Sequence, residues 1–148
     1  MSECIFKWVK KDDLMVGVNT AGPIDDKTWA AFMEDFTAGD FSYYIGGTLG
    51  ILEVSPVQRR QAAVALREHS MGLVVITDDV LVRGVVTAVS WLGAKVRSFA
   101  WKDFDRAMDH INIVDRKQEV TEILDRLRAE CLAELEAQRE ERRRSLHG

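Results

Sequence analysis

The chain has 148 residues, 47% of them hydrophobic and 30% charged, proportions typical of a soluble globular protein. Its formal net charge of -4 lacks the basic balance that nucleic-acid binding usually shows, so we expect no nucleic-acid partner. The two cysteines stand far apart, the N-terminus lacks a secretion signal, and no apolar run approaches the roughly 18 residues of a membrane span. We therefore expect a cytoplasmic protein with no membrane span.

The N-terminal part predicts a β-hairpin followed by a helix. In "CIFKWVKKDDLMVGVNT", apolar residues alternate on either side of a polar Lys-Lys-Asp-Asp turn, as in paired strands. In "GPIDDKTWAAFMEDFTAGD", Asp25 or Asp26 can cap a helix and Gly39 can end it. The large apolar residues of this helix share one face and are more typical of a core than of a ligand box: Trp29, Phe32, Met33 and Phe36.

The next stretch predicts a strand, a glycine loop and a second helix. We expect the strand over 41–45 and the loop at 46–47, where two glycines stand together. In "ILEVSPVQRRQAAVALRE", Ser55 occupies the N-cap position and Pro56 the first helical position, where its missing N–H costs nothing. This helix is expected to close near Gly72.

Two further strands and two further helices are predicted before residue 112. "GLVVITDD" is short, β-branched and uninterrupted, as central parallel strands are. Asp78 or Asp79 can cap the helix that follows, over 80–92. "AKVRSFAWKD" alternates like a strand, and "FDRAMDHI" is one more helix.

The last part of the chain predicts one long charged amphipathic helix, which divides the chain into 1–112 and 113–148. From Asp115 the sequence is rich in Glu, Arg, Leu and Ala. One apolar seam runs along it: Val120, Leu124, Leu127, Cys131 and Leu135. Such a seam needs a partner surface, so we expect its first half to pack on the chain's own domain and the part beyond Leu135 to project. A homodimer built on the seam is the alternative.

Motifs for catalysis, phosphate binding or metal binding are missing from the sequence. "GGTLG" lacks the Lys-Ser/Thr of a P-loop, and none of the three histidines has a second ligand at i+3 or i+4. Asp78 and Asp79 are neighbours on extended chain and point to opposite faces, which does not suit an acid/base pair. We therefore expect no enzyme, no cofactor and no metal.

The order of the elements carries a resemblance. The predicted order is hairpin, helix, strand, serine-capped helix, strand, helix, strand and helix. With the stretches "ILEVSPVQRRQAAVAL", "GLVVITDDVLVRGVV" and "AKVRSFAWKDFDRAMDHI", this order resembles that of bacterial STAS-like proteins over residues 5–111. This fold group includes anti-anti-sigma factors and CRAL-TRIO-like lipid-binding relatives. The resemblance implies an α/β fold: a mixed sheet with an N-terminal β-hairpin, helices packed on the sheet, and a long C-terminal helix.

The resemblance also implies a role for Ser55. In such families a strand leads through a loop to a helix whose first residue is often a serine that a partner kinase phosphorylates to control docking, and Ser55 occupies the equivalent place. A helix N-terminus offers free N–H groups to a phosphate. The family's serine usually follows an aspartate, whereas Ser55 follows Val54, so simple capping stays open beside the switch.

Two functional hypotheses follow. The first is a non-enzymatic regulatory module that docks a protein partner through the Ser55 helix and the helix over 80–92. Its expected partner-binding residues are Ser55, Arg59, Arg60, Arg83 and Trp91. The second is a small-molecule or lipid-binding domain with an apolar pocket under the first and third helices, suggested by the aromatic face of the first helix and by Trp91.

Overall fold

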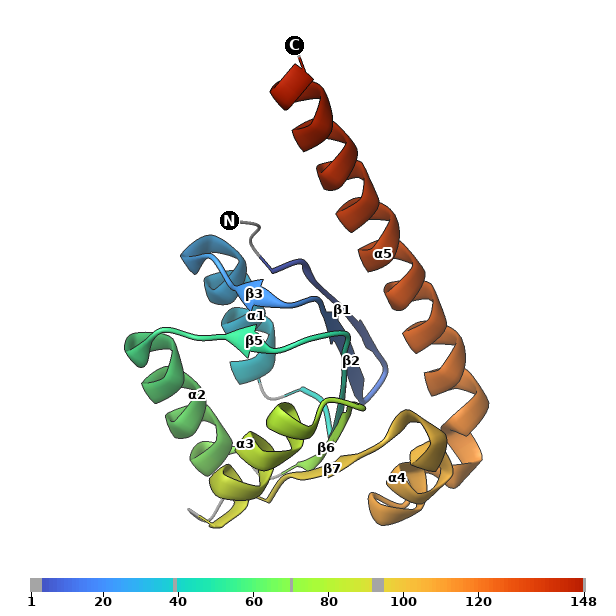
Figure 1. The fold of residues 1–148 in the computed structure, drawn as a ribbon. Coiled ribbons are helices and arrows are strands. Elements are labelled where there is room, and N and C mark those ends of the chain that lie inside the picture. The colour runs from blue at the N-terminus through green and yellow to red at the C-terminus, as the bar shows by residue number, and fades with distance from the viewer. Residues whose placement is uncertain (1–3, 39, 70, 92–94, 148) are drawn as a thin grey trace.

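A five-stranded mixed sheet forms the centre of the protein in a computed structural model that describes residues 4–38, 40–69, 71–91 and 95–147 (Figure 1). The strand order is β1-β2-β4-β6-β7. The strands are β1 (Phe6–Lys11), β2 (Leu14–Asn19), β4 (Tyr43–Thr48), β6 (Gly72–Ile76) and β7 (Arg97–Phe99). β1 is antiparallel to β2, and the other neighbours are parallel. The short β3 (Gly22–Pro23) pairs with β5 (Leu52–Glu53) outside this sheet.

The N-terminal hairpin forms where the sequence predicts it. The pairing of β1 with β2 begins at Lys11 opposite Leu14, so Asp12 and Asp13 form a two-residue turn between the strands. Asp12 takes a φ of 55° in this turn, a left-handed conformation that aspartate tolerates better than most residues. Arg116 donates to the carboxylate of Asp13, so an ion pair ties the turn to the start of the C-terminal helix.

The helices form two layers, one on each face of the sheet (Figure 1). The connections from β2 to β4, β4 to β6 and β6 to β7 carry α1 (Asp26–Thr37), α2 (Pro56–Glu68) and α3 (Val80–Trp91). Parallel crossovers are nearly always right-handed, and all three step in the same direction, so these helices share one face. The other face carries the 3-10 turns η1 (Trp101–Asp103) and η2 (Val114–Arg116) with α4 (Phe104–His110) and α5 (Lys117–His147).

Two apolar cores result from the alternation of side chains along the strands. On the face under α4 and α5, Val16, Ile45 and Val74 are fully buried together with the apolar seam of α5. On the opposite face, Met15 and Tyr44 pack with the aromatic side of α1. The α/β fold with a mixed sheet, an N-terminal hairpin and a long C-terminal helix is therefore present as expected.

The first half of α5 packs on its own domain, which confirms that prediction. The buried seam residues, at 0 to 2% exposure, are Val120, Leu124, Leu127 and Cys131. Lys7 of β1 pairs with Glu134 at 3.0 Å beside the seam. Beyond Leu135 nearly every described side chain is exposed, and the helix projects past the sheet (Figure 1). Although α5 is long, neither it nor any other helix in the described ranges is apolar enough to cross a membrane.

Two boundaries predicted from the sequence are wrong. Gly46 and Gly47 do not form a loop; they belong to β4 and pair with β2 and β6. A Cβ on Gly47 would lie 2.8 Å from the Trp101 ring, so close packing on the sheet explains this glycine. The second helix ends at Glu68, and Gly72 starts β6 instead of closing the helix. Gly39, the expected end of the first helix, lies outside the described residues.

Candidate functional site

An apolar cavity of about 310 Å³ lies between the sheet and the three crossover helices. All three helices contribute to its walls, which include Phe32 and Phe36 of α1, Ala62 and Leu66 of α2, and Val82 and Val86 of α3. Packing in a protein interior normally leaves few voids larger than a water molecule. The helices on this face therefore do not close fully on the sheet.

The floor of the cavity is formed by side chains of β4 and β6 that point to the helix side of the sheet: Tyr44, Gly46, Thr48, Leu73 and Val75. Gly46 pairs in register with Gly17 of β2. A Cβ on Gly17 would lie 2.7 Å from the Tyr44 hydroxyl, and a Cβ on Gly46 would lie 3.0 Å from the Tyr44 ring. The two glycines thus make room for Tyr44 to lie close to the sheet.

Tyr44 is deeply buried but keeps a free hydroxyl. Its side chain is 8% exposed, and its ring meets Phe32 and Phe36 edge-on, with centroids 5.9 and 5.7 Å away. Burial raises the pKa of the Tyr44 phenol well above its usual range, so the group is neutral at ordinary pH. Within the described ranges no group forms a hydrogen bond with this hydroxyl.

The cavity contains further polar atoms but no charge. The Thr48 hydroxyl is buried in the wall and has no partner among the described residues. The Asn19 amide lies at the edge and donates to the carbonyl oxygens of Thr20 and Gly50, at 3.0 and 3.1 Å. Of the described residues that line the cavity, none carries a charged side chain. Its chemistry is therefore apolar with a few neutral hydrogen-bonding groups.

The helix α3 forms the roof of the cavity and is apolar on more than one side. Val82, Val85 and Val86 line the cavity, although Val85 is 60% exposed, and Val80 and Leu81 are 77 and 67% exposed. A helix that is apolar all round is normally buried. Several apolar side chains of the described part of the roof are therefore open to solvent.

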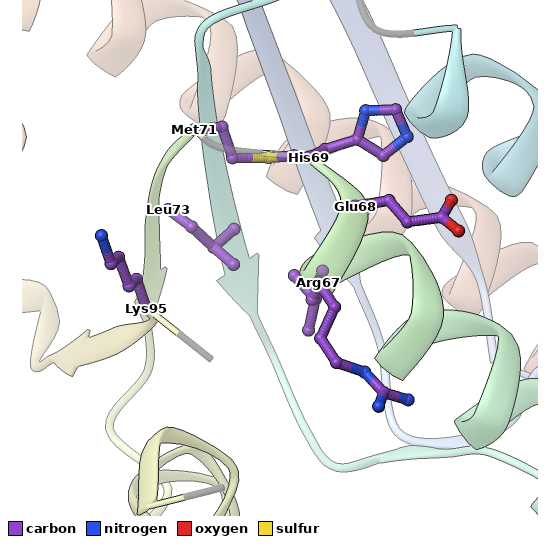
Figure 2. A pocket seen from close by; sticks show the side chains of 7 residues that line it. Arg67, Glu68, His69, Met71, Leu73 and Lys95 are labelled. Carbon is purple, nitrogen blue, oxygen red and sulfur yellow. The ribbon is translucent and has the colours of Figure 1, made fainter. Parts of the chain in front are cut away.

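A second, more polar pocket of about 290 Å³ adjoins the cavity and shares Leu66 and Leu73 with it. Figure 2 shows its charged side chains, which do not converge: Arg67 and Glu68 extend away from Lys95. Arg67 Nε donates to the Ala63 carbonyl oxygen of its own helix at 3.3 Å. The arrangement does not form a defined anion site.

Ser55 caps α2, as the sequence predicts. Its Oγ accepts from the backbone N–H of Gln58 at 3.1 Å, and the Gln58 side chain accepts from the backbone N–H of Ser55 at 2.9 Å. This reciprocal pair is a capping box. The sequence analysis missed Gln58, although the Ser-x-x-Gln spacing is the signal for it.

The three predicted partner-binding arginines do not line the cavity, although the groove that holds Arg83 shares Val86 and Val96 with it. Arg59 and Arg60 are exposed near the start of α2. Arg83 is exposed on α3 and lines a shallow groove beside β7 together with Arg97. The side chain of Trp91 lies outside the described part of the structure. The structure therefore does not bring these residues together with the cavity in one site.

The aspartate pair does not form an acid/base site. Asp79 caps α3, where its Oδ1 accepts from the backbone N–H of Leu81 at 2.8 Å. Asp78 Oδ1 accepts from the backbone N–H of Trp101 at 3.1 Å. In the described ranges, no group of three or more His, Cys, Asp or Glu side chains is placed so that it could hold a metal ion.

Comparison of the sequence with known proteins does not identify a family for this chain. No protein-family model matches the sequence, and no curated protein is significantly similar to it.

Proposed function

We propose that the domain binds a small apolar molecule in the cavity between the sheet and α1, α2 and α3. The observation that carries the proposal is the cavity itself, which has about 310 Å³ and a wall that is apolar except for a few neutral groups. Ligand sites in proteins occupy about 300 to 1,000 Å³ and combine apolar walls with a few polar groups. The cavity lies at the lower end of this range and suits a small ligand.

The contrast between the two faces of the sheet supports a binding role. Under α4 and α5, Val16, Val74 and Ile76 are fully buried in a continuous core. On the opposite face, the floor formed by Tyr44, Leu73 and Val75 is not fully covered by the helices, which leaves the cavity of about 310 Å³. An apolar cavity of this size can accept an apolar molecule.

A fluorescence titration with N-phenylnaphthylamine, a neutral apolar probe, tests the proposal. Ala62 of α2 lines the cavity, so Ala62→Phe should fill it and weaken probe binding strongly. Ala63 is the exposed next residue, and Ala63→Phe adds the same ring outside the cavity. Equal binding by both variants and the wild type would contradict the proposal.

A second candidate function is the docking of a protein partner on α2 and α3, in a non-enzymatic regulatory role. It is supported by the resemblance to cytoplasmic bacterial STAS-like proteins and by exposed apolar side chains on these helices. Val57 is 56% exposed and Leu81 67% exposed. Ser55 is exposed at the N-terminus of α2, where a phosphate would meet free N–H groups.

Partner capture from the native host tests this candidate. Leu81→Glu on α3 should lose the partner, whereas Leu132→Glu on α5, at a leucine that is 52% exposed, should retain it. If Ser55 is a switch, Ser55→Asp should also lose the partner while it keeps the melting temperature of the wild type. Capture that is the same for all four proteins would reject the candidate.

A homodimer through α5 is a further proposal about partners. Since the seam is buried against the sheet, such a dimer would have to use the exposed Leu132 and Leu146. Light scattering at high protein concentration tests it, with Leu146→Glu as the variant that should restore a monomer.

A further inference from the structure

The Tyr44 hydroxyl is one of the few neutral polar groups in a mainly apolar cavity, together with the Thr48 hydroxyl and the Asn19 amide. Tyr44 is more than nine-tenths buried and lines the cavity. Its hydroxyl lies over Gly17, forms no hydrogen bond with a described residue and keeps some accessible surface. A tyrosine hydroxyl at an otherwise buried site usually finds a hydrogen-bond partner.

A phenylalanine at position 44 would keep the packing of the ring. The contacts of the Tyr44 ring with Phe32 and Phe36 involve only the ring. The hydroxyl therefore adds nothing to these contacts and is available to a partner from outside the chain.

The uncharged wall restricts what that partner can be. A charged group placed in the cavity would lose its hydration without gaining a counter-ion, because the described lining residues are all neutral. Charged side chains lie outside the cavity, in the pocket that shares Leu66 and Leu73 with it and in the groove that shares Val86 and Val96 with it. In the former, Arg67 and Glu68 extend away from Lys95 (Figure 2). A neutral phenol can donate a hydrogen bond and can also accept one.

We propose that the ligand is a neutral, largely apolar molecule with one hydroxyl or carbonyl group, and that this group hydrogen-bonds with the Tyr44 hydroxyl. The inference rests on the proposed function and adds the chemical class of the ligand. It makes Tyr44 the residue that selects a polar ligand over a hydrocarbon of the same shape.

Three probes that share one ring system test this selectivity on the wild-type protein: naphthalene, naphthol and naphthoate. An engineered apolar cavity of about 150 Å³ holds benzene, so two fused rings suit a cavity of about twice that volume. Naphthol should bind about two- to tenfold more tightly than naphthalene, the range expected for one net hydrogen bond. Naphthoate, which is charged, should bind most weakly.

Tyr44→Phe and Tyr43→Phe form a matched pair of variants. Tyr43 and Tyr44 are adjacent in β4 and point to opposite faces of the sheet, and only Tyr44 lines the cavity. Tyr44→Phe should bind naphthalene as well as the wild type does and should bind naphthol no better than naphthalene. Tyr43→Phe should retain the wild-type preference for naphthol.

The outcomes separate the two proposals. If naphthalene binds but naphthol binds no better, or if Tyr44→Phe keeps the preference, the inference about Tyr44 is wrong and the apolar site stands. Tightest binding of naphthoate would also overturn the inference. If none of the three probes binds and N-phenylnaphthylamine also fails to bind, the proposed function itself is wrong.

Discussion

The Tyr44 hydroxyl lies over Gly17 of the neighbouring strand, at a position where a Cβ on Gly17 would be only 2.7 Å away. Tyr44 has little freedom to move, because Phe32 and Phe36 pack against its ring. Gly17→Ala should therefore destabilise the protein by about 1 to 3 kcal/mol, as overpacking of a core does. Urea denaturation followed by circular dichroism measures this change.

Gly84→Ala provides the matched control for Gly17→Ala. Gly84 lies inside α3, and nothing lies within 4 Å of its added Cβ. This substitution should stabilise the protein by about 0.4 to 1 kcal/mol, because alanine favours a helix and restricts the unfolded chain. In a Tyr44→Phe background the cost of Gly17→Ala should fall. A cost that is unchanged in that background would show that the hydroxyl is not the clashing group.

The elements with strong local signals could be predicted from the sequence. The Lys-Lys-Asp-Asp turn gave the hairpin, Ser55 with Pro56 gave the start of α2, and the apolar seam gave the packing of α5. Each of these signals depends on residues that are close together in the sequence, so a short segment is enough to recognise it.

The features that depend on distant contacts could not be predicted. Glycine pairs usually mark turns, so the sequence analysis placed Gly46 and Gly47 in a loop. The reason for these glycines lies in Tyr44 and Trp101, and only the folded chain places Trp101 above Gly47. A pocket under the first and third helices was one of two hypotheses, but its floor and the role of Tyr44 depend on how far α3 lies from the sheet.

Ser55 should contribute to stability through its cap. Ser55→Ala removes the acceptor for the Gln58 N–H and should cost about 1 kcal/mol. Ser55→Asp should keep the stability of the wild type, because aspartate caps equally well and its charge suits the helix N-terminus. Ser42→Ala, at an exposed serine outside any helix, should change stability by less than about 0.5 kcal/mol. Thermal melting of the three variants checks the order, and equal melting of Ser55→Ala and Ser42→Ala would refute the cap.

Leu124 and Leu132 should differ sharply in their contributions, although both lie on α5. Leu124 is 2% exposed in the core under the sheet, and Leu124→Ala should cost about 2 to 5 kcal/mol. Leu132 is 52% exposed, and Leu132→Ala should change stability by less than about 0.5 kcal/mol. Chemical denaturation of both variants measures the difference. Similar small effects would mean that α5 is not packed on the domain in solution.

The two cysteines should make the protein less stable at alkaline pH. Burial raises the pKa of both Cys4 and Cys131 from the ordinary 9.0 to about 11. Below pH 9.0 the thiols are protonated in both states and contribute no pH dependence; between 9.0 and about 11 the unfolded chain loses their protons while the native protein keeps them. The free energy of unfolding should therefore fall as the pH rises through this window.

A Cys131→Ala variant isolates the contribution of one thiol. Its absolute stability will be lower, because Cys131 is fully buried, but its stability should fall less steeply over the same pH window. Urea titrations at several alkaline pH values measure both slopes. Identical slopes for the variant and the wild type would show that the Cys131 thiol ionises equally in both states.

Methyl-resolved NMR during a naphthol titration tests the central claim, a ligand site on one face of the sheet, most directly. In β6 the side chains of Leu73 and Val75 line the cavity, whereas Val74 and Ile76 point into the opposite core. We expect the methyl signals of Leu73 and Val75 to shift and to saturate with the ligand, while those of Val74 and Ile76 stay in place. Shifts that appear equally on both faces, or no shift at any ligand concentration, would contradict the account.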